Sequence, residues 1–242
     1  MNTPFFSIIT ICFNPGELFL ITANSLINQT YRNFEWIVVD GLSNPQSLKV
    51  IDEYMQEISK FVSEPDDGIS DAWNKGIRMS EGKYILLLNA GDSYDDDFLE
   101  CIAPSCHGNN VIAAGARLVI EGRSVAELLP KVHLLHRGMY LPHNWIAIPK
   151  HVYDQVGGYT NIDLSMDYEW LKRYLSIFGI KNIVIFNRTF GAYLADGKSD
   201  RNYIKSFYNN FLINTKYKNG FFLSAYIFIG SVLKHSVSRL FR

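Results

Sequence analysis

Hydrophobic and polar positions along the first 90 residues follow the pattern of buried strands and amphipathic helices. Continuous apolar runs at 6–11, 35–39 and 83–88 have the length of strands covered on both faces. Between them, apolar residues recur every three or four positions over 18–31 and 48–58, which predicts helices packed against a sheet. A strand, a helix and a second strand of these lengths form a right-handed parallel unit. The pattern therefore predicts an α/β domain.

The second half of the chain predicts a mixed sheet. Apolar runs at 111–120 and 124–128 flank a Glu121-Gly122 turn, which indicates a hairpin and not another crossover. Further strands are expected at 60–63, 143–148 and 183–186, and further helices at 149–156 and 167–178. We therefore expect a mixed, mostly parallel sheet that is flanked by helices.

The last forty residues differ in kind from the rest. Residues 201–242 contain no Asp or Glu, and their aromatic residues are interleaved with Lys205, Lys216 and Lys218. An apolar helix flanked by cations suits the interface of an anionic membrane, where each basic residue contributes about 1 kcal/mol. Packing on the core is the alternative. We favour membrane or partner contact, because 221–233 is apolar around most of its circumference.

Composition excludes several classes of protein. A hydrophobic content of 48% in 242 residues is ample for a packed core, so the chain is not disordered. Its 23 basic and 24 acidic residues give a net charge of -1, which argues against nucleic-acid binding. The three cysteines form no CxxC pair and fit a reducing cytoplasm. We expect neither a signal peptide nor a membrane-spanning helix, because no apolar run is long enough.

Polar residues gather where the strand at 83–88 ends. Asn89, Gly91 and Asp92 follow it directly. In open α/β sheets, ligands bind just outside the carboxyl ends of the strands, so we expect Asp92 to contact a ligand. The preceding helix places Asp71 and Asn74 on neighbouring positions of one face. The sequence therefore predicts a site between this helix and the end of the strand.

Four segments in order carry a resemblance to a known family: SIITICFN, FEWIVVDGLS, SEPDDGISDAWNKGI and SEGKYILLLNAGD. They resemble glycosyltransferase family 2, whose members adopt the Rossmann-like GT-A fold. Within it they look like the bacterial subset that builds O-antigen, capsule or colanic-acid-type surface polysaccharides. The segments LPHNWIAIPK, GGYTNIDLSMDYEWLKR and ADGKSD resemble the acceptor side of that subset. The resemblance implies a catalytic domain at 1–200, with a nucleotide-sugar half at 1–100 and an acceptor half at 101–200, before a helical, amphipathic and membrane-proximal segment at 201–242.

The resemblance also implies a set of donor-binding residues. It places Phe13 against the nucleotide base and Asp40 within hydrogen-bonding reach of it. An aromatic face stacks on any base, and a carboxylate selects bases that present an N–H donor. Core packing for Phe13 and a turn role for Asp40 are the alternatives. The resemblance aims Asp71 and Asn74 at the donor, and it assigns Asn89 to the ribose or to a metal-bound water.

The motif NAGD occupies the metal-binding position of the family, where Asp-x-Asp is usual. Asn89 and Gly91 replace the first two acidic positions, so Asp92 is left as the hard oxygen ligand. A departing diphosphate needs its charge neutralised, and one carboxylate with phosphate oxygens and waters can hold Mg²⁺ or Mn²⁺. We therefore expect a weakly bound Mg²⁺ or Mn²⁺ at Asp92.

Inverting sugar transfer requires one base that takes the proton of the acceptor hydroxyl. Asp167, in SMDYEW, matches the acidic position of the family on the acceptor side, and Glu169 is the neighbouring candidate. Two residues apart on a helix, they do not face the same point, and we favour Asp167. Capping of its helix is the alternative role. His143, Lys198 and Ser199 are expected to hold the acceptor or the diphosphate.

The resemblance implies an inverting enzyme of the hexosyltransferase type. It would move a sugar from a nucleotide diphosphate to a lipid-linked or glycan acceptor at the cytoplasmic face of the inner membrane. We expect peripheral contact with the membrane or with membrane-bound assembly proteins. A non-catalytic homologue that binds a nucleotide sugar or a partner is the alternative, because the metal motif is thinned. A nucleotidyltransferase would need a Gly-rich, basic loop after the first strand, which FNPGELF lacks.

Overall fold

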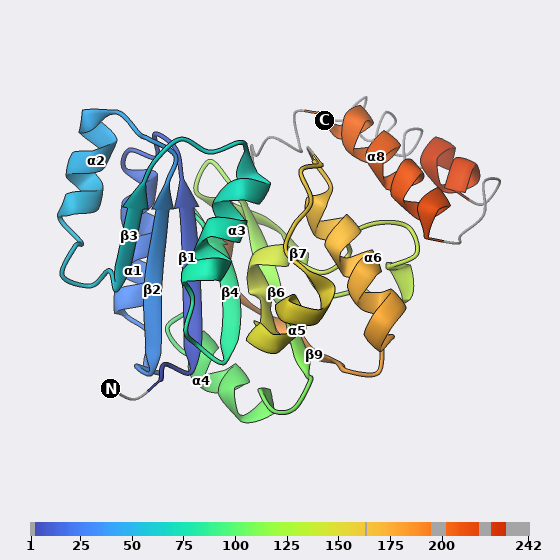
Figure 1. Cartoon of the computed structure of the whole chain (residues 1–242), viewed down its shortest axis with the longest axis horizontal. Coiled ribbons are helices and arrows are strands. Elements are labelled where there is room, and N and C mark those ends of the chain that lie inside the picture. Colours follow the sequence, from blue (N-terminus) through green and yellow to red (C-terminus); the bar gives the residue numbers. More distant parts are fainter. Residues whose placement is uncertain (1–2, 163, 195–201, 218–223, 231–242) are drawn as a thin grey trace.

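Figure 1 shows the computed structural model of the chain, which describes residues 3–162, 164–194, 202–217 and 224–230. Within these residues the strands form one nine-stranded sheet in the order β3-β2-β1-β4-β8-β6-β9-β5, with β7 paired to β6. Helices cover both faces of this sheet (Figure 1). The α/β class and the mixed, mostly parallel sheet expected from the sequence are confirmed.

The first half of the sheet is parallel. Its strands are β1 (Phe6–Cys12), β2 (Phe34–Asp40), β3 (Lys60–Ser63) and β4 (Tyr84–Asn89). Their continuous apolarity has a simple cause, because both faces are buried. Ile8 packs in the layer beneath α1 (Leu18–Ile27) and α2 (Pro45–Asp52), whereas Ile9 packs in the layer beneath α3 (Ile69–Met79).

The second half closes the sheet with strands of both directions. The remaining strands are β5 (Ser93–Tyr94), β6 (Val111–Ile120), β7 (Arg123–Leu128), β8 (Ile146–Pro149) and β9 (Ile183–Leu194). The hairpin of β6 and β7 is confirmed, and both of its turn residues, Glu121 and Gly122, have positive φ. The remaining helices are α4 (Phe98–Ile102), α5 (Lys150–Val156), α6 (Met166–Phe178) and α8 (Tyr203–Lys216).

Several boundaries differ from the predicted ones, and the strand expected to end at 186 continues to Leu194. Helix α1 ends at Ile27 and not at 31, because Gln29 and Thr30 bond instead to the carbonyls of Asp95 and Asp96. Helix α2 ends at Asp52, before the apolar positions expected to extend it to 58. Residues 143–145 form a 3-10 turn, so the strand predicted from 143 begins at Ile146. Tertiary hydrogen bonds, which periodicity does not encode, end α1.

Each C-terminal helix has one buried face and one exposed face. Helix α8 packs on α6 and buries Ile213 and Asn214, and the helix at 224–230 buries Ser224 and Ile227. Packing on the domain is therefore part of the role of this segment, although we favoured membrane contact over it. The opposite face of each helix is exposed. Among the described residues, the search for an apolar helix of membrane-spanning length finds none.

Candidate functional site

The carboxyl ends of the parallel strands meet at one edge of the sheet. Cys12 at the end of β1 lies in register with Asp40 of β2, and Asp40 lies in register with Ser63 of β3. On the other side of β1, Ile11 pairs with Asn89 at the end of β4. The residues predicted at separate strand ends therefore share one edge, as open α/β sheets require of a ligand site.

Phe13 and Asp40 occupy different environments at this edge. The Phe13 side chain is 68% exposed, which rules out core packing for its ring in this structure. Asp40 is fully buried, and its Oδ2 accepts from the Ser43 backbone N–H at 2.9 Å and from Ser63 Oγ at 2.6 Å. These bonds tie β2 to β3 and to the following turn. Asp40 thus has the turn contacts that we considered as its alternative role, and its contact with a base stays a prediction.

Lys75 forms ion pairs with three carboxylates in and beside the acidic turn between β3 and α3. Its Nζ lies 2.7 Å from Asp66 Oδ1 and 3.1 Å from both Glu64 Oε1 and Asp71 Oδ2. Burial alone would raise the pKa of Asp71, but the hydrogen bonds from Lys75 and from the Asp67 N–H, together with the charges of Lys75 and Arg78, outweigh it and hold that pKa below its ordinary value. Asp71 also accepts from the Asp67 N–H, so its carboxylate shapes the turn.

Asn74 does not join this cluster, although the spacing predicted one face with Asp71. Its Nδ2 donates to the Tyr159 carbonyl and its Oδ1 accepts the Tyr159 N–H, both at 2.8 Å. A Cβ at Gly158 would lie 2.3 Å from Asn74 Oδ1, so this approach requires glycine. The amide of Asn74 therefore joins α3 to the segment after α5.

Asp92 is a buried carboxylate with amide donors around it. It is 3% exposed; Oδ1 accepts the Leu194 N–H at 2.9 Å, and Oδ2 accepts from Asn144 Nδ2. Burial raises the pKa of Asp92 to about 7, and the bonds from Leu194, Asn144 and Asn89 act in the opposite direction. Among the described residues, no cationic side chain forms an ion pair with it. The carboxylate thus lacks a positive charge beside it in the described part of the chain.

The oxygen atoms at Asp92 fit a divalent cation that takes few of its ligands from the protein. Hydrogen bonds from Leu194, Asn144 and Asn89 use three of the four lone pairs of the Asp92 carboxylate, so one lone pair is left for a cation. Among the described residues, no group of three or more His, Cys, Asp or Glu side chains is placed to hold a metal ion. A cation here would therefore take most of its ligands from water and phosphate, as Mg²⁺ commonly does.

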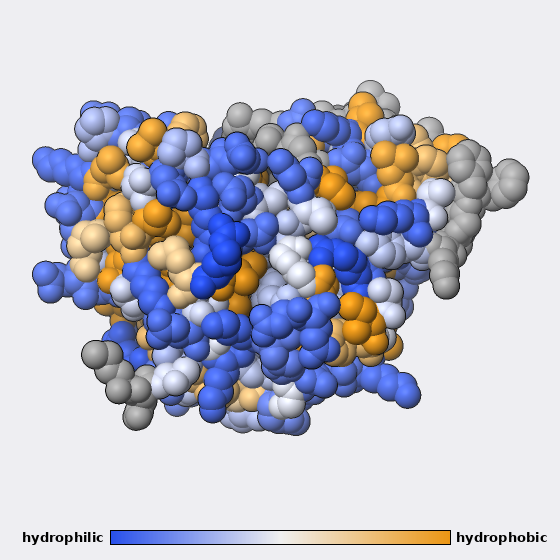
Figure 2. Space-filling view, in the orientation of Figure 1, coloured by the Kyte–Doolittle hydropathy of each residue, from blue (hydrophilic) through white to orange (hydrophobic). Residues whose placement is uncertain are grey.

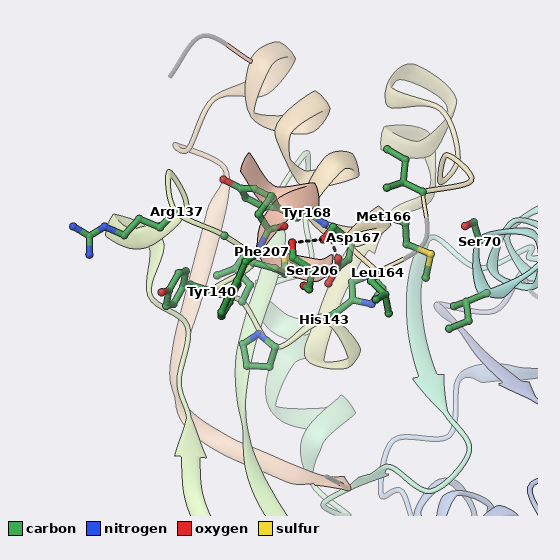
Figure 3. A pocket seen from close by; sticks show the side chains of 18 of the residues that line it. Ser70, Arg137, Tyr140, His143, Leu164, Met166, Asp167, Tyr168, Ser206 and Phe207 are labelled. Atoms are coloured by element: carbon green, nitrogen blue, oxygen red, sulfur yellow. Dashed lines mark hydrogen bonds between the residues drawn. The ribbon is translucent and has the colours of Figure 1, made fainter. Parts of the chain in front are cut away.

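A cavity of about 670 Å³ extends from Asn89 and Asn144 to the C-terminal helices. Both of these amides bond to Asp92, so the carboxylate lies directly behind one end of the cavity. Asp167 and His143 line it, and so does Phe207 of α8 (Figure 3).

Asp167 and Glu169 have opposite environments on α6. Asp167 is half-buried and lines the cavity, and its Oδ1 accepts its neighbour's N–H at Tyr168. Glu169 is 1% exposed, does not line the cavity, and accepts from Tyr217 at 2.7 Å and from Arg173 at 3.0 Å. Burial would raise the pKa of Glu169, but these donors lower it. Only Asp167 of the pair is therefore placed to meet a ligand in this cavity.

His143 lies beside Asp167 in the wall of the cavity. Its Nε2 is 2.9 Å from the Tyr159 hydroxyl, which is itself 3.2 Å from the Tyr153 hydroxyl. Burial lowers the pKa of His143, and the charge of Asp167 acts in the opposite direction. The ring is accordingly neutral near pH 7 and can share a proton with Tyr159. Lys198 and Ser199 lie outside the described residues.

Comparison with known proteins decides the family. Residues 7–176 match the model of the family described as glycosyl transferase family 2. The chain belongs to this family. Membership classes it among the glycosyltransferases, in agreement with the resemblance of its first 100 residues.

Two curated relatives of this family 2 chain match it over part of their length. A PGL/p-HBAD biosynthesis glycosyltransferase of Mycobacterium bovis (strain BCG / Pasteur 1173P2) is 31% identical over 107 residues, or 43% of this chain and 42% of the relative. A cholesterol galactosyltransferase of Borreliella burgdorferi is 27% identical over 106 residues, or 43% of this chain and 30% of the relative. The chain thus matches less than half the length of either.

Solved structures share the fold over most of the chain. S. aureus TarS 1-349 in complex with UDP-GlcNAc has a TM-score of 0.69 at 15% identity and covers 96% of this chain and 72% of its own. The mannosyltransferase PcManGT from Pyrobaculum calidifontis, in complex with GDP-Man and Mn²⁺, has a TM-score of 0.68 at 14% identity and covers 94% of this chain and 70% of its own. At these identities the likeness establishes the common GT-A architecture.

Three residues that contact the candidate site were not among the site residues predicted from the sequence. Asn144 reaches Asp92 across 52 positions, and Tyr159 reaches Asn74 across 85. Asp66 approaches the edge formed by the strand ends next to Gly41, where a Cβ would lie 2.9 Å from its Oδ2. The DG turn signal and the PHNW segment mark these neighbourhoods, but the pairings arise only when distant segments fold together.

Proposed function

We propose that this chain is an inverting, nucleotide-sugar-dependent glycosyltransferase. The observation that carries the proposal is a single cavity with Asp167 in its wall and the Asp92 cluster behind one end. A base and a diphosphate site must lie on opposite sides of the reacting sugar carbon in a single displacement. The cavity provides space for a sugar between them, and family membership supports this class of reaction.

The donor lies at the edge formed by the strand ends. Phe13, with its exposed ring, stacks on the base, and Asn89 faces the ribose or a water at the cation. Asp40, Asp71 and Asn74 form the walls of this subsite through the contacts described above. That TarS binds UDP-GlcNAc and PcManGT binds GDP-Man on the same fold supports a nucleotide sugar as the donor class.

Asp92, with Asn89, holds Mg²⁺ or Mn²⁺ in this proposal. The cation supplies positive charge for the departing diphosphate. The buried, uncompensated carboxylate and the presence of Mn²⁺ in the PcManGT complex support this assignment. The chain itself orients the carboxylate through Asn144 and the Leu194 N–H.

Asp167 accepts the proton of the acceptor hydroxyl at its carboxylate. His143, held by Tyr159, lies beside it and hydrogen-bonds the acceptor. A single base gives inversion, because no covalent sugar intermediate forms on the protein. Glu169 is excluded from this role by its burial and by its set of partners, namely Thr160, Arg173, Lys216 and Tyr217.

The acceptor is lipid-linked or glycan, and the pathway is bacterial surface polysaccharide synthesis of the O-antigen or capsule type. The protein acts at the cytoplasmic face of the membrane, in peripheral contact with lipid or with assembly proteins. The motifs quoted above and the apolar C-terminal helices support this placement. A cholesterol galactosyltransferase among the relatives supports an apolar acceptor class.

Calorimetry with UDP-GlcNAc and GDP-Man, each with and without Mn²⁺, tests the proposal. We expect cation-dependent binding of one donor and slow release of its nucleoside diphosphate, because water replaces the acceptor. Donor binding without any release or transfer, across both donors and a range of simple acceptors, would favour the non-catalytic homologue. Absence of donor binding would contradict both.

A further inference from the structure

The two C-terminal helices each expose large apolar side chains. On α8, Ile204, Tyr208 and Leu212 are four residues apart and all are exposed, so they form one stripe. On the helix at 224–230, Tyr226 is 72% exposed and Ile229 is 56% exposed. Figure 2 shows hydrophobic surface over this end of the molecule. We call these five residues the outer face.

The segment that carries the outer face contains basic residues and no acidic ones. Residues 201–242 contain seven Lys or Arg and no Asp or Glu, whereas the whole chain is nearly neutral. Of these cations, Lys205 and Lys216 lie on α8 and are exposed. An apolar helical face with a cationic border complements a bilayer with anionic headgroups, which accepts apolar side chains at its surface and attracts basic ones.

The same helices wall the cavity on their inner side. Phe207 and Asn214 of α8 and Ile227 of the second helix line it. Phe211 and Phe228 also line it, and their ring centroids lie 6.0 Å apart. Tyr208 of the outer face lies 6.3 Å from the Phe211 ring and 6.4 Å from the Phe228 ring. An aromatic cluster therefore connects the outer face to the cavity that contains Asp167.

We propose that the outer face docks on an anionic bilayer, and that the Tyr208–Phe211–Phe228 cluster guides the alkyl chain of a lipid-anchored acceptor from the bilayer into the cavity. The first part stands on the surface alone. The second part rests on the proposed function and narrows its acceptor to the lipid-linked class. An amphiphile with a polar head and a long alkyl chain matches a cavity whose lining includes the polar groups of Asp167 and His143 and the aromatic rings of Phe211 and Phe228.

Vesicle flotation tests the docking part without any donor or acceptor. The full chain is floated with POPC vesicles and with POPC:POPG vesicles at a ratio of about 7:3, so that only the second set is anionic. We expect binding to the anionic vesicles, with a loss on the order of 100-fold for the combined Ile204→Ser, Tyr208→Ser and Leu212→Ser variant. Lys205→Gln with Lys216→Gln should weaken binding about 30-fold.

The matched control is Ile177→Ser with Ile180→Ser, which removes two isoleucines that are as exposed but lie away from the outer face. This control should float like the wild type. Equal losses in the control and the outer-face variant would overturn the docking part, and so would absence of flotation of the wild-type chain. Circular dichroism of each variant confirms that it is folded.

Calorimetry with dodecyl phosphate and butyl phosphate tests the guiding part, since both share the head and differ in the chain. We expect at least roughly tenfold tighter binding of the longer probe, and we expect Phe211→Ala to abolish that preference. Equal affinities, or a preference untouched by Phe211→Ala, would overturn this part. Donor binding measured on the wild type and on the same variants separates the two failures. If the donor binds but the alkyl chain makes no difference, the lipid acceptor is refuted. If the wild type binds no donor, the proposed function is refuted.

Discussion

Replacement of Asp92 by asparagine tests how the carboxylate is held. The pKa of Asp92 rises from its ordinary value of 3.8 to about 7 because the group is buried without an opposite charge among the described residues. The folded state therefore binds this proton more tightly than the unfolded chain does. The stability that this proton contributes is complete below pH about 4 and is lost as the pH rises through about 7.

The size of the effect follows from that shift. Between pH 5 and about pH 7 the unfolded chain has already lost this proton while the folded state still holds it. Over these roughly two pH units the unfolding free energy of the wild type falls by about 1.36 kcal/mol per unit, or roughly 3 kcal/mol in all. The asparagine amide of the variant carries no charge at either pH. The difference in unfolding free energy between the Asp92→Asn variant and the wild type should therefore shift in favour of the variant by roughly 3 kcal/mol from pH 5 to pH 8.

Urea denaturation at pH 5 and pH 8 measures this difference. The control is Asp154→Asn, which changes an exposed aspartate on α5 and should show no such dependence. Mn²⁺ with UDP should restore the stability of the wild type at pH 8 and leave Asp92→Asn unchanged. A difference between variant and wild type that is the same at both pH values would refute the account of Asp92 as an uncompensated buried charge.

Three further variants test neighbouring contacts. Gly158→Ala should lower the unfolding free energy by about 2 kcal/mol or more in urea denaturation, because its Cβ would meet Asn74 Oδ1 at 2.3 Å; Gly230→Ala, with nothing within 4 Å of its Cβ, should cost less. Glu169→Gln should destabilise the chain by about 2 kcal/mol at pH 7, since Arg173 loses its charged partner, while donor affinity measured by calorimetry stays unchanged; a loss of donor affinity would contradict its structural role. Asn144→Ala should weaken Mn²⁺ binding, followed by electron paramagnetic resonance, about tenfold because Asp92 loses its Nδ2 donor, and unchanged affinity would refute that positioning role.

The strands and their burial could be predicted because they depend on local periodicity. Both neighbours of Ile8 and Ile9 in the sheet are apolar, and the two residues fill opposite layers, so a continuous apolar run specified the parallel half correctly. The end of α1 could not be predicted, since the Thr30 backbone N–H bonds to the carbonyl of Asp96, 66 positions away, and not to the preceding turn of the helix.

The sequence located the edge of the sheet where the candidate site lies, but it did not predict which groups its side chains contact. The end of β4 and the first turn of α6 were located from motif and spacing, and the structure brings Asn89 and Asp167 to one cavity. The spacing of Asp71 and Asn74 predicted a shared direction, but Asn74 bonds to Tyr159, which follows a helix far along the chain. Helical spacing fixes a face, and tertiary contacts decide what each side chain on it touches.

Sugar transfer by the Asp167→Asn variant, with donor affinity measured alongside, tests the central claim most directly. We expect turnover to fall by about 10³-fold while the dissociation constant of the donor stays within about twofold, because an asparagine keeps the shape of the side chain and cannot accept the proton of the acceptor hydroxyl. Turnover close to that of the wild type, with the donor bound equally well, would contradict the assignment of Asp167 as the base.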